Sequence, residues 1–367
     1  MNPYPRTWID IDLSLLAGNL AHVRQAVGPK PLIALVAKAD AYGHGLIPIV
    51  RQAIRSGADW ICVATVQEGI ALRDAGIAAP ILVISPILPV EAEQAVFYEL
   101  RITIERFETA KALHDAGIRQ DKKALVHLEV DTGLSRFGCA ADKAAELLLR
   151  LKELDQIEVE GLSHHFVDSG ANQDRTKAQI KIFDDLISEL SKHNICPKML
   201  HGSNSAGAIS YPEHSKDMVR VGILAYGIDP YGIKGEGTKP LLSWYTRVTA
   251  LREIEPLSTV GYCEGYRTFR NSKIATLGAG YGDGYPRSLS NLGRVVIKGK
   301  IARVIGLVCM DQMMVEASDI EDLEVGEIAT LIGPEQPVEL LAKYSKTNCH
   351  EIPTRIMSRV PRRYLSK

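Results

Sequence analysis

The stretch LIALVAKADAYGHG, residues 32–45, joins an apolar run to a lysine and then to a turn rich in glycine. A continuous apolar run is typical of a strand that is buried on both faces, as in a parallel sheet. Lys38 follows that strand, and the carboxyl ends of barrel strands are where catalytic residues gather. Partial desolvation there favours the neutral amine, the form that makes a Schiff base. Taken alone, the stretch fits equally well a structural lysine whose ammonium group reaches solvent.

The alternation of apolar runs with amphipathic segments continues to about residue 228. In one such segment Ile180, Phe183, Ile187 and Leu190 are spaced to share one helical face. Eight strand–helix units in roughly 200 residues predict an α/β fold, a (β/α)8 barrel of the TIM type. The predicted strands are Leu32–Ala37, Trp60–Ala64, Ile81–Ile84, Ile102–Ile104, Ala124–Val130, Ile157–Leu162, Lys198–His201 and Met218–Leu224.

The pattern changes after the segment DPYGIKGEGTKP, residues 229–240, which is rich in glycine and proline and is interpreted as a linker. Runs of β type follow, and helix-like stretches are scarce before Val338–Tyr344. We therefore expect a barrel over residues 1–235, whose first 12 or so residues pack with a mostly-β domain over residues 236–367. The predicted strands of that domain are Leu242–Thr249, Lys273–Leu277, Val295–Ile297, Arg303–Val308 and Ile328–Leu331.

Composition narrows the function classes. The net charge of −1, from 43 basic and 44 acidic residues, gives no excess of positive charge that would indicate binding to nucleic acid or an anionic membrane. No apolar run approaches the ~18–20 residues that span a bilayer, and no signal-peptide pattern opens the chain. The six cysteines form no CxxC pair and none has a histidine at ligand spacing. We expect reduced thiols in a cytoplasmic protein without a bound metal.

Two later motifs add a phosphate-binding pattern to Lys38. SNSAG at 203–207 follows the seventh predicted strand, and VRVGILAYG at 219–227 covers the eighth. The loops after strands seven and eight are where barrels commonly bind phosphate. A lysine able to form a Schiff base, together with a phosphate cradle, indicates pyridoxal phosphate.

Six motifs together resemble the alanine racemase family, and the resemblance runs from Arg6 to the RVPRRY segment at 359–364. It implies an isomerase that interconverts L- and D-alanine and supplies D-alanine for cell-wall peptidoglycan. It also implies a homodimer whose active site is shared across the interface. The motifs are VAKADAYGHG (36–45), DTGLSRFG (131–138), SNSAG (203–207), DMVRVGI (217–223), GYGDGYPR (280–287) and VCMDQ (308–312).

The resemblance also implies a role for individual residues. Lys38 matches the lysine that holds the cofactor and serves as one base, and Tyr262 matches the second base, contributed by the other subunit. A phenol of pKa ~10 is a poor base at neutral pH without help. In the family that help comes from a chain that here would run from Arg220, which faces the pyridine nitrogen, through His165 to Tyr262.

The remaining implied residues bind substrate or cofactor. Arg136 matches the residue that binds the substrate carboxylate, a role suited to its planar fork of donors. Taken singly, most of these residues fit a structural role better, and Met310 ordinarily packs; the functional interpretation depends on the whole set. The full implied set is Lys38, Tyr42, His165, Asn204, Ser205, Arg220, Gly222, Ile223 and His350 for the cofactor, and Arg136, Tyr281 and Met310 for the substrate and its entrance.

Four positions depart from the family pattern. Glu129 stands where many relatives carry a carbamylated lysine, and we hypothesise that it presents a carboxylate directly to Arg136. His350 replaces a tyrosine near the phosphate. Leu307 and Gly170 replace an arginine and an aspartate that pair across the interface, and losing both avoids a lone buried charge. A wider or less polar entrance would follow, so a serine or broad-specificity racemase is the alternative.

Two further alternatives come from other classes. The same barrel supports decarboxylases of basic amino acids, but these need no base at Tyr262 and an acidic recognition signature that the second domain lacks. Barrel proteins that only bind pyridoxal phosphate lack a β domain. Because the fold does not choose among these functions, the choice rests on Tyr262, Arg136 and Arg220.

Overall fold

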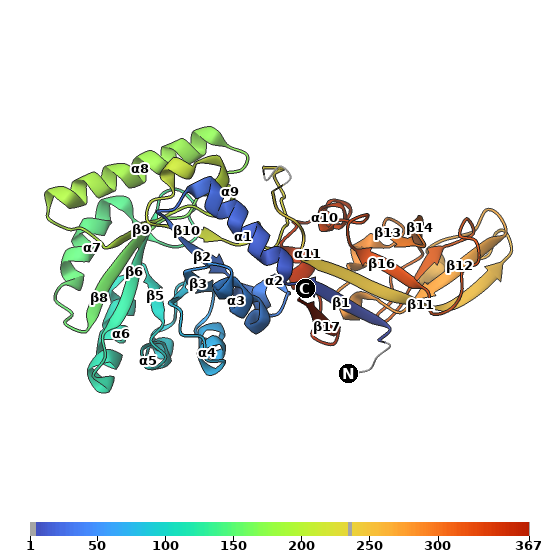
Figure 1. The fold of residues 1–367 in the computed structure, drawn as a ribbon, viewed down its shortest axis with the longest axis horizontal. Coiled ribbons are helices and arrows are strands. Elements are labelled where there is room, and N and C mark those ends of the chain that lie inside the picture. Colours follow the sequence, from blue (N-terminus) through green and yellow to red (C-terminus); the bar gives the residue numbers. More distant parts are fainter. Residues whose placement is uncertain (1–4, 234–236, 367) are drawn as a thin grey trace.

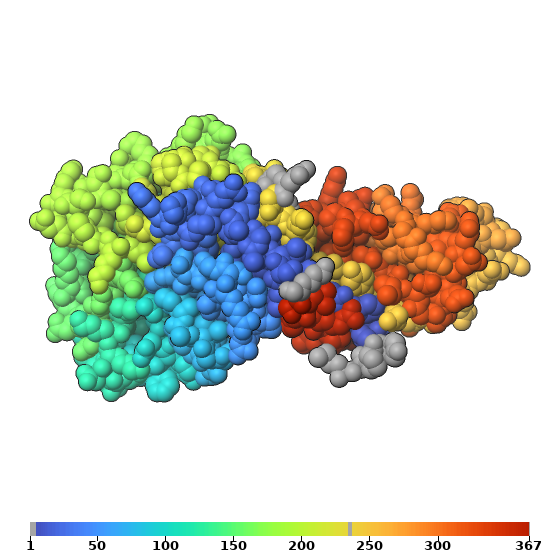
Figure 2. Space-filling view, viewed as in Figure 1, coloured from blue at the N-terminus to red at the C-terminus, as the bar shows by residue number. Residues whose placement is uncertain are grey.

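The computed structural model describes residues 5–233 and 237–366, so the middle of the expected linker lies outside the described residues. The molecule is elongated, with a barrel at one end and a β domain at the other (Figure 1). The first strand and the last residues meet at the junction between them, where Figure 2 places blue against red. Within the described ranges, no helix is long and apolar enough to cross a membrane.

The barrel is a closed, parallel sheet of eight strands, as predicted. Closure comes from the pairing of β5 with β6 and of β2 with β10. The eighth strand ends three residues earlier than expected, because Gly222 begins a turn in which its carbonyl accepts from Ala225 N at 2.8 Å. The strands are β2 (Leu32–Val36), β3 (Trp60–Val63), β4 (Ile81–Val83), β5 (Arg101–Ile104), β6 (Ala124–Asp131), β8 (Ile157–Ser163), β9 (Met199–His201) and β10 (Met218–Val221), with β7 (Cys139–Ala140) added beside β6.

Helices cover the outside of this sheet (Figure 1). In α8 (Gln173–Lys192), Ile180, Phe183 and Leu190 are buried on the predicted face, and Leu186 joins them. Apolar burial of this kind holds each helix on the barrel. The others are α1 (Ser14–Val27), α3 (Leu46–Arg55), α4 (Val66–Asp74), α5 (Ala92–Phe97), α6 (Phe107–Gln120), α7 (Ala144–Leu151) and α9 (Ser205–Ser210).

The β domain is an eight-stranded sheet, three strands of which the sequence did not predict. The β1 strand pairs antiparallel with β11 and parallel with β17, so both ends of the chain join this sheet. Two helices, α10 (Val338–Ser345) and α11 (Glu351–Thr354), lie between β16 and β17 in the chain. The strands are β1 (Thr7–Asp12), β11 (Leu242–Ile254), β12 (Ser272–Leu277), β13 (Arg294–Ile297), β14 (Lys300–Ile305), β15 (Met313–Glu316), β16 (Ile328–Ile332) and β17 (Arg362–Leu365).

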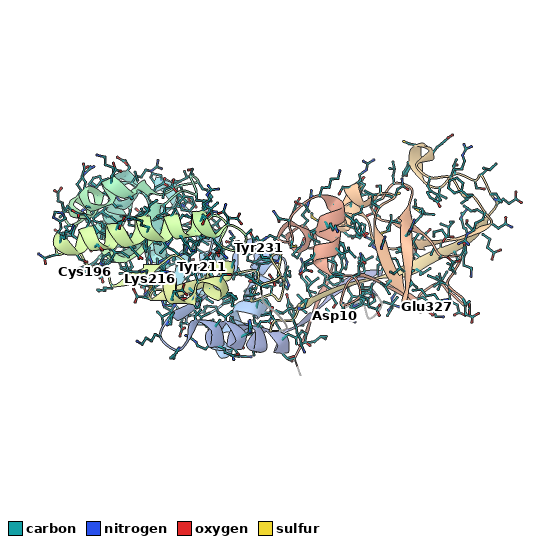
Figure 3. All side chains as sticks on the ribbon, turned by 90° about the horizontal axis from the view of Figure 1, so that it is seen from above. Asp10, Cys196, Tyr211, Lys216, Tyr231 and Glu327 are labelled. Carbon is teal, nitrogen blue, oxygen red and sulfur yellow. The ribbon has the colours of Figure 1, made fainter. Side chains whose placement is uncertain are left out.

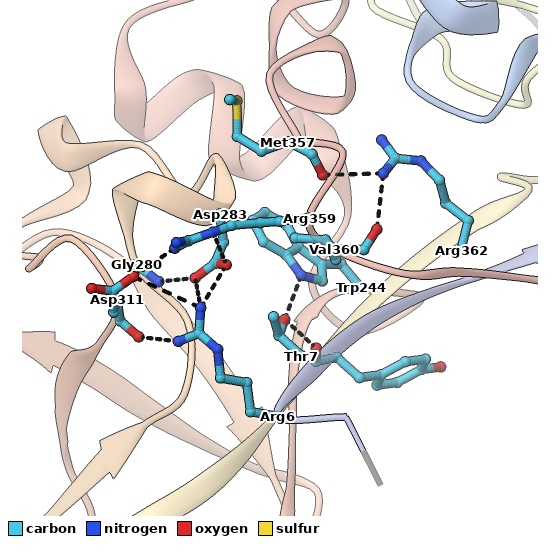
Figure 4. Close-up of polar contacts among 11 residues, drawn as sticks. Arg6, Thr7, Trp244, Gly280, Asp283, Asp311, Met357, Arg359, Val360 and Arg362 are labelled. Atoms are coloured by element: carbon cyan, nitrogen blue, oxygen red, sulfur yellow. Dashed lines mark hydrogen bonds and ion pairs between the residues drawn. The ribbon is translucent and has the colours of Figure 1, made fainter. Parts of the chain in front are cut away.

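A buried carboxylate ties the start of β1 to the loop that carries Tyr281. Asp283 is 1% exposed and accepts from Arg6 NH2, Arg359 Nε and Gly280 N, each at 2.9 Å (Figure 4). Beside it, Tyr281 N donates to Cys309 O at 3.0 Å, which fixes the approach of the two loops. The carboxylate thus organises the segment on which the predicted entrance residues lie.

We expect Asp283→Ala to lower the free energy of unfolding by about 1–3 kcal/mol, because the buried Gly280 N and two half-exposed arginines lose the carboxylate that they share. Urea denaturation followed by circular dichroism measures the change. Asp311→Ala is the matched control: Asp311 pairs with the same arginines but is 53% exposed, so a loss of at most about 1 kcal/mol is expected. Equal losses in the two variants would contradict this account.

Candidate active site

A cavity of about 660 Å³ opens at the carboxyl ends of the barrel strands, where the sequence placed the site. Nine predicted residues line it: Lys38, Tyr42, His165, Asn204, Ser205, Arg220, Gly222, Ile223 and His350. Further lining residues were not predicted, among them Ile84, Val167, Ser169, Tyr231, Asn348, Glu351 and Thr354. The predicted cofactor set is therefore gathered in one place.

The turn after Lys38 is left-handed, which the sequence did not predict. Four non-glycine residues in succession, 39–42, have φ between 53° and 55°. Left-handed backbone costs an L-residue roughly 1–2 kcal/mol. Local hydrogen bonds offset that cost: Leu46 N donates to Asp40 Oδ1 at 2.7 Å and Ala39 N to Glu68 Oε1 at 2.6 Å. Strain held in this way is common at functional sites.

The Lys38 amine lies in surroundings that disfavour its charged form. Burial lowers the pKa of Lys38, the positive charge of Arg136 lowers it further, and Glu68 and Cys62 act in the opposite direction. A lowered pKa increases the fraction of neutral amine near neutral pH. The site therefore prepares Lys38 to attack a carbonyl or to accept a proton.

Removing the neighbouring positive charge should reverse part of this effect. With Arg136→Gln, the ammonium form of Lys38 is less disfavoured, so the pKa of Lys38 in the cofactor-free protein is expected to rise. Competitive amine labelling across a pH series, with Lys38 followed by mass spectrometry, measures it. Arg150→Gln is the control, since Arg150 also lies over a phenylalanine ring, at 4.3 Å, but on α7 away from the cavity. An unchanged or lower pKa in Arg136→Gln would contradict the assignment.

Hydroxyl and backbone groups form a cradle on one wall of the cavity. Gly222 N donates to Ser205 Oγ at 3.0 Å. A side chain at Gly222 would place its Cβ 2.5 Å from Tyr42 Oη, so only glycine lets that hydroxyl approach the backbone. Asn204 caps α9 by accepting from Gly207 N at 3.0 Å and from Ser169 Oγ at 2.8 Å, which holds Ser205 in position.

Arg220 is the buried cation of the site. It is 5% exposed, and its NH2 donates to His164 O at 2.8 Å and to His165 Nδ1 at 3.1 Å. Burial, and then the charge of Arg220, hold the pKa of His165 well below its ordinary value, so the ring is neutral. His164 instead packs against Phe166 and Phe183 in the barrel wall. His165 is therefore the member of the pair that faces the cavity.

The hydrogen-bond partner of Glu129 is not Arg136, as we had hypothesised, but Ser163. Glu129 accepts a hydrogen bond from Ser163, its neighbour across the β6–β8 pair. Burial raises the pKa of Glu129, and the charge of Arg220 opposes that before the charge of Arg136 does. Among the described residues no hydrogen bond joins Glu129 to Arg136, which lies over the Phe137 ring at 4.9 Å on the loop beyond the strand. The carboxylate is therefore held by Ser163 rather than by Arg136.

The other departures have local packing reasons. Any side chain at Gly170 would place its Cβ 2.5 Å from Tyr231 Cγ, so the aromatic ring occupies that space. Tyr231 lies at the junction of the barrel and the β domain (Figure 3). Leu307 packs beneath the Tyr262 loop, where a Cβ on Gly265 would lie 3.3 Å from Leu307 Cγ. His350 stands 5.9 Å from the Tyr42 ring, centroid to centroid, and closes the cavity wall.

Four predicted site residues are not among the described residues that line the cavity. One of them, Arg136, lies on the loop after β6. The other three, Tyr262, Tyr281 and Met310, are 70%, 41% and 54% exposed on the β domain. Tyr262 begins a short 3-10 turn, Tyr262–Glu264, in which Cys263 is left-handed with φ 55°. Large side chains gathered at a surface in this way are typical of a binding interface. One chain by itself therefore places no tyrosine hydroxyl of the β domain in the cavity.

The fold and the cavity define the class of protein: a two-domain barrel protein with a lysine suited to a Schiff base after the first barrel strand and a β domain beside the barrel. Two family models match, "Alanine racemase, N-terminal domain" over residues 11–230 and "Alanine racemase, C-terminal domain" over residues 241–364. The chain belongs to the alanine racemase family. This confirms the predicted family, the barrel with a β domain, and an isomerase as the class of enzyme.

Individual relatives agree along the whole chain. The alanine racemase of Halothermothrix orenii is 38% identical over 98% of this chain and 97% of its own length. The crystal structure of alanine racemase from D-cycloserine-producing Streptomyces lavendulae has a TM-score of 0.93 and 30% identity, covering 100% of this chain and 98% of that one. The alanine racemase from Bartonella henselae with covalently bound pyridoxal phosphate has a TM-score of 0.90 and 26% identity, covering 98% and 100%.

Proposed function

We propose that this chain interconverts L- and D-alanine with pyridoxal phosphate, as a cytoplasmic homodimer that supplies D-alanine for peptidoglycan. In this proposal residues 1–235 hold the cofactor together with His350, and other residues of the β domain, residues 236–367, complete the site of the other copy. The observation that carries it is the cavity in which Lys38 lies with Arg220, His165 and the Ser205–Gly222 cradle.

The residues present fit the cofactor. The Tyr42 and Ser205 hydroxyls and the backbone of Gly222 and Ile223 suit a phosphate group, and Lys38 suits an aldehyde. When bound, pyridoxal phosphate supplies an electron-withdrawing ring that makes the Cα proton of an attached amino acid acidic. Arg220 bears a full positive charge and cannot accept a hydrogen bond, so it would disfavour protonation of a pyridine nitrogen beside it and would thereby suppress other reactions.

Racemisation removes a proton from one face of Cα and returns one to the other face. Lys38 Nζ serves one face, and its lowered pKa suits both directions of transfer. Tyr262 of the partner subunit serves the other. Because Arg220 donates to His165 Nδ1, the neutral His165 ring carries its proton on Nε2. An N–H donated to the phenol oxygen of Tyr262 stabilises the phenolate and so assists proton removal.

The specificity of the site is the point on which the alternative differs. His350 lines the cavity near Tyr42, and Tyr231 with Gly170 shapes its outer side. A serine or broad-specificity racemase would use the same bases. Purified protein with pyridoxal phosphate is tested on L-alanine, L-serine, L-lysine and L-arginine, following chirality and carbon dioxide. Dominant D-alanine supports the proposal, comparable D-serine supports the alternative, and carbon dioxide contradicts both.

A further inference from the structure

A chain of polar side chains runs from Arg220 through the interior of the barrel to its opposite end. Arg220 NH1 hydrogen bonds to His201 Nδ1, and His201 Nε2 lies 2.8 Å from His127 Nδ1. His127 Nε2 lies 3.3 Å from Glu160 Oε2, which also accepts from Arg101 Nε at 3.3 Å. His127 and His201 are 0% and 1% exposed, whereas Glu160 is partly accessible.

The proton positions along this chain follow from its two ends. Arg220 can only donate, and an ionised Glu160 can only accept. Glu160 therefore accepts a hydrogen bond from the Nε2–H of His127. The Nδ1 lone pair of His127 is then free to accept from His201 Nε2. His201 Nδ1 then accepts from Arg220. Both rings are neutral with the proton on Nε2, and every donor in the chain faces an acceptor.

The charges around the chain favour that arrangement. Burial would raise the pKa of Glu160, but the hydrogen bond from His127 and the charge of Arg101 outweigh it and hold that pKa below its ordinary value. Burial is the main cause that lowers the pKa of His127 and of His201. At His127, Glu160 raises the pKa, and the charges of Arg101 and Arg220 lower it further. The charge of Arg220 and the neighbouring His127 and His164 lower the pKa of His201 further.

The backbone leaves room for the hydrogen-bonded side chains between Arg220 and Glu160. A side chain at Gly161 would place its Cβ 2.3 Å from His127 Nδ1, the atom that meets His201. The β6–β8 pairing shifts register at this point, so that His127 pairs with Gly161. At the far end Arg101 lies over the Trp60 ring at 5.2 Å, and Trp60 packs edge-on against His127. Glycine, bulge and ring together keep His127 in one orientation.

We propose that Glu160 is a positioning residue for the reaction: through His127 and His201 it keeps the Nδ1 lone pair of His201 turned toward Arg220. This rests on the proposed function, in which Arg220 faces the cofactor ring. Without the Glu160 carboxylate, only Arg220 still favours these tautomers. In molecules where both rings take the other tautomer, His201 presents an N–H to the N–H of Arg220. A buried pair of donors is costly, so Arg220 would shift from its place at the cavity wall.

The test reads the tautomers directly. In the full-length holoenzyme labelled with ¹⁵N-histidine, long-range ¹H–¹⁵N spectra are expected to show one tautomer, protonated on Nε2, for both His127 and His201. Glu160→Gln offers an amide that both donates and accepts, so a second set of signals should appear for both rings. The turnover number kcat should fall about tenfold with KM unchanged, a loss typical of outer-shell partners.

Two variants make the test decisive. Glu158→Gln alters the carboxylate two residues earlier on β8, which pairs with Lys198, and should change neither the tautomers nor kcat. Glu160→Asp keeps a carboxylate and should retain the single tautomers. It serves as the second variant in case Glu160→Gln does not fold. Protons on Nδ1 in the wild type, unchanged tautomers in Glu160→Gln, or altered tautomers at full kcat would overturn the proposal. A wild type with the expected tautomers but no racemisation would refute the proposed function, and with it this role for Glu160.

Discussion

Replacing Tyr262 by phenylalanine is expected to lower kcat for L-alanine by about 10²–10⁴-fold, the usual loss when a positioned acid or base is removed. The phenylalanine ring keeps the shape of the side chain and deletes only the hydroxyl. Tyr262 is 70% exposed on one chain and phenylalanine fills the same space in the dimer, so the free energy of unfolding should change by no more than about 0.5 kcal/mol. Circular-dichroism assays of alanine chirality and urea denaturation measure the two quantities.

Isotope exchange makes this prediction specific to a two-base reaction. In D₂O, the Tyr262→Phe enzyme should still exchange the Cα hydrogen of one enantiomer through Lys38, while exchange of the other enantiomer falls with racemisation. Tyr266→Phe is the control, since Tyr266 lies four residues further along and packs against the β-domain cluster around Val260. Equal loss of exchange for both enantiomers would argue against a separate base on each face.

Replacing Lys38 by methionine has the second large expected effect. The variant loses one base and the amine that binds the cofactor covalently, so kcat should fall by at least about 10⁴-fold. Cofactor bound only through the cradle should also leave the protein on gel filtration. The free energy of unfolding should not fall, because methionine removes a partly buried amine beside Arg136.

A lysine-to-methionine substitution outside the cavity is the control for effects on folding that are unrelated to the site. Lys216→Met alters a lysine that is 27% exposed and pairs with Asp184, away from the cavity. That variant should keep its turnover number and its cofactor. If Lys38→Met kept its cofactor through gel filtration and turned over alanine, Lys38 would not be the covalent attachment point.

The barrel was predictable because each strand carries its own signal. Several runs, such as Leu32–Val36, are apolar on both faces, and eight strand–helix units in succession leave few other folds. The strands β1 and β17 carry no such signal. The residues Arg362–Leu365 are half charged, and their pairing with Ile9–Asp12 joins the two ends of the chain. Only tertiary contacts make such segments strands.

The site divides in the same way. Lys38 and the segments SNSAG and VRVGILAYG at strands seven and eight were found from residue type and position, whereas the role of Tyr262 came only through resemblance. The left-handed turn at residues 39–42 was missed, because alanine and tyrosine rarely take positive φ and one aspartate among them does not indicate four such residues in succession. Tyr231 was missed because it stands in a stretch that reads as a linker, and linkers are not expected to line cavities.

The central claim, that each site takes Lys38 from one copy and Tyr262 from the other, is tested most directly by mixing two inactive variants. Lys38→Met and Tyr262→Phe, carrying different affinity tags, are unfolded and refolded together, and the doubly tagged dimers are purified. A dimer of one copy each contains one site with both bases and one with neither. We predict about half of the wild-type turnover per dimer. Doubly tagged dimers as inactive as their parents would contradict a shared site.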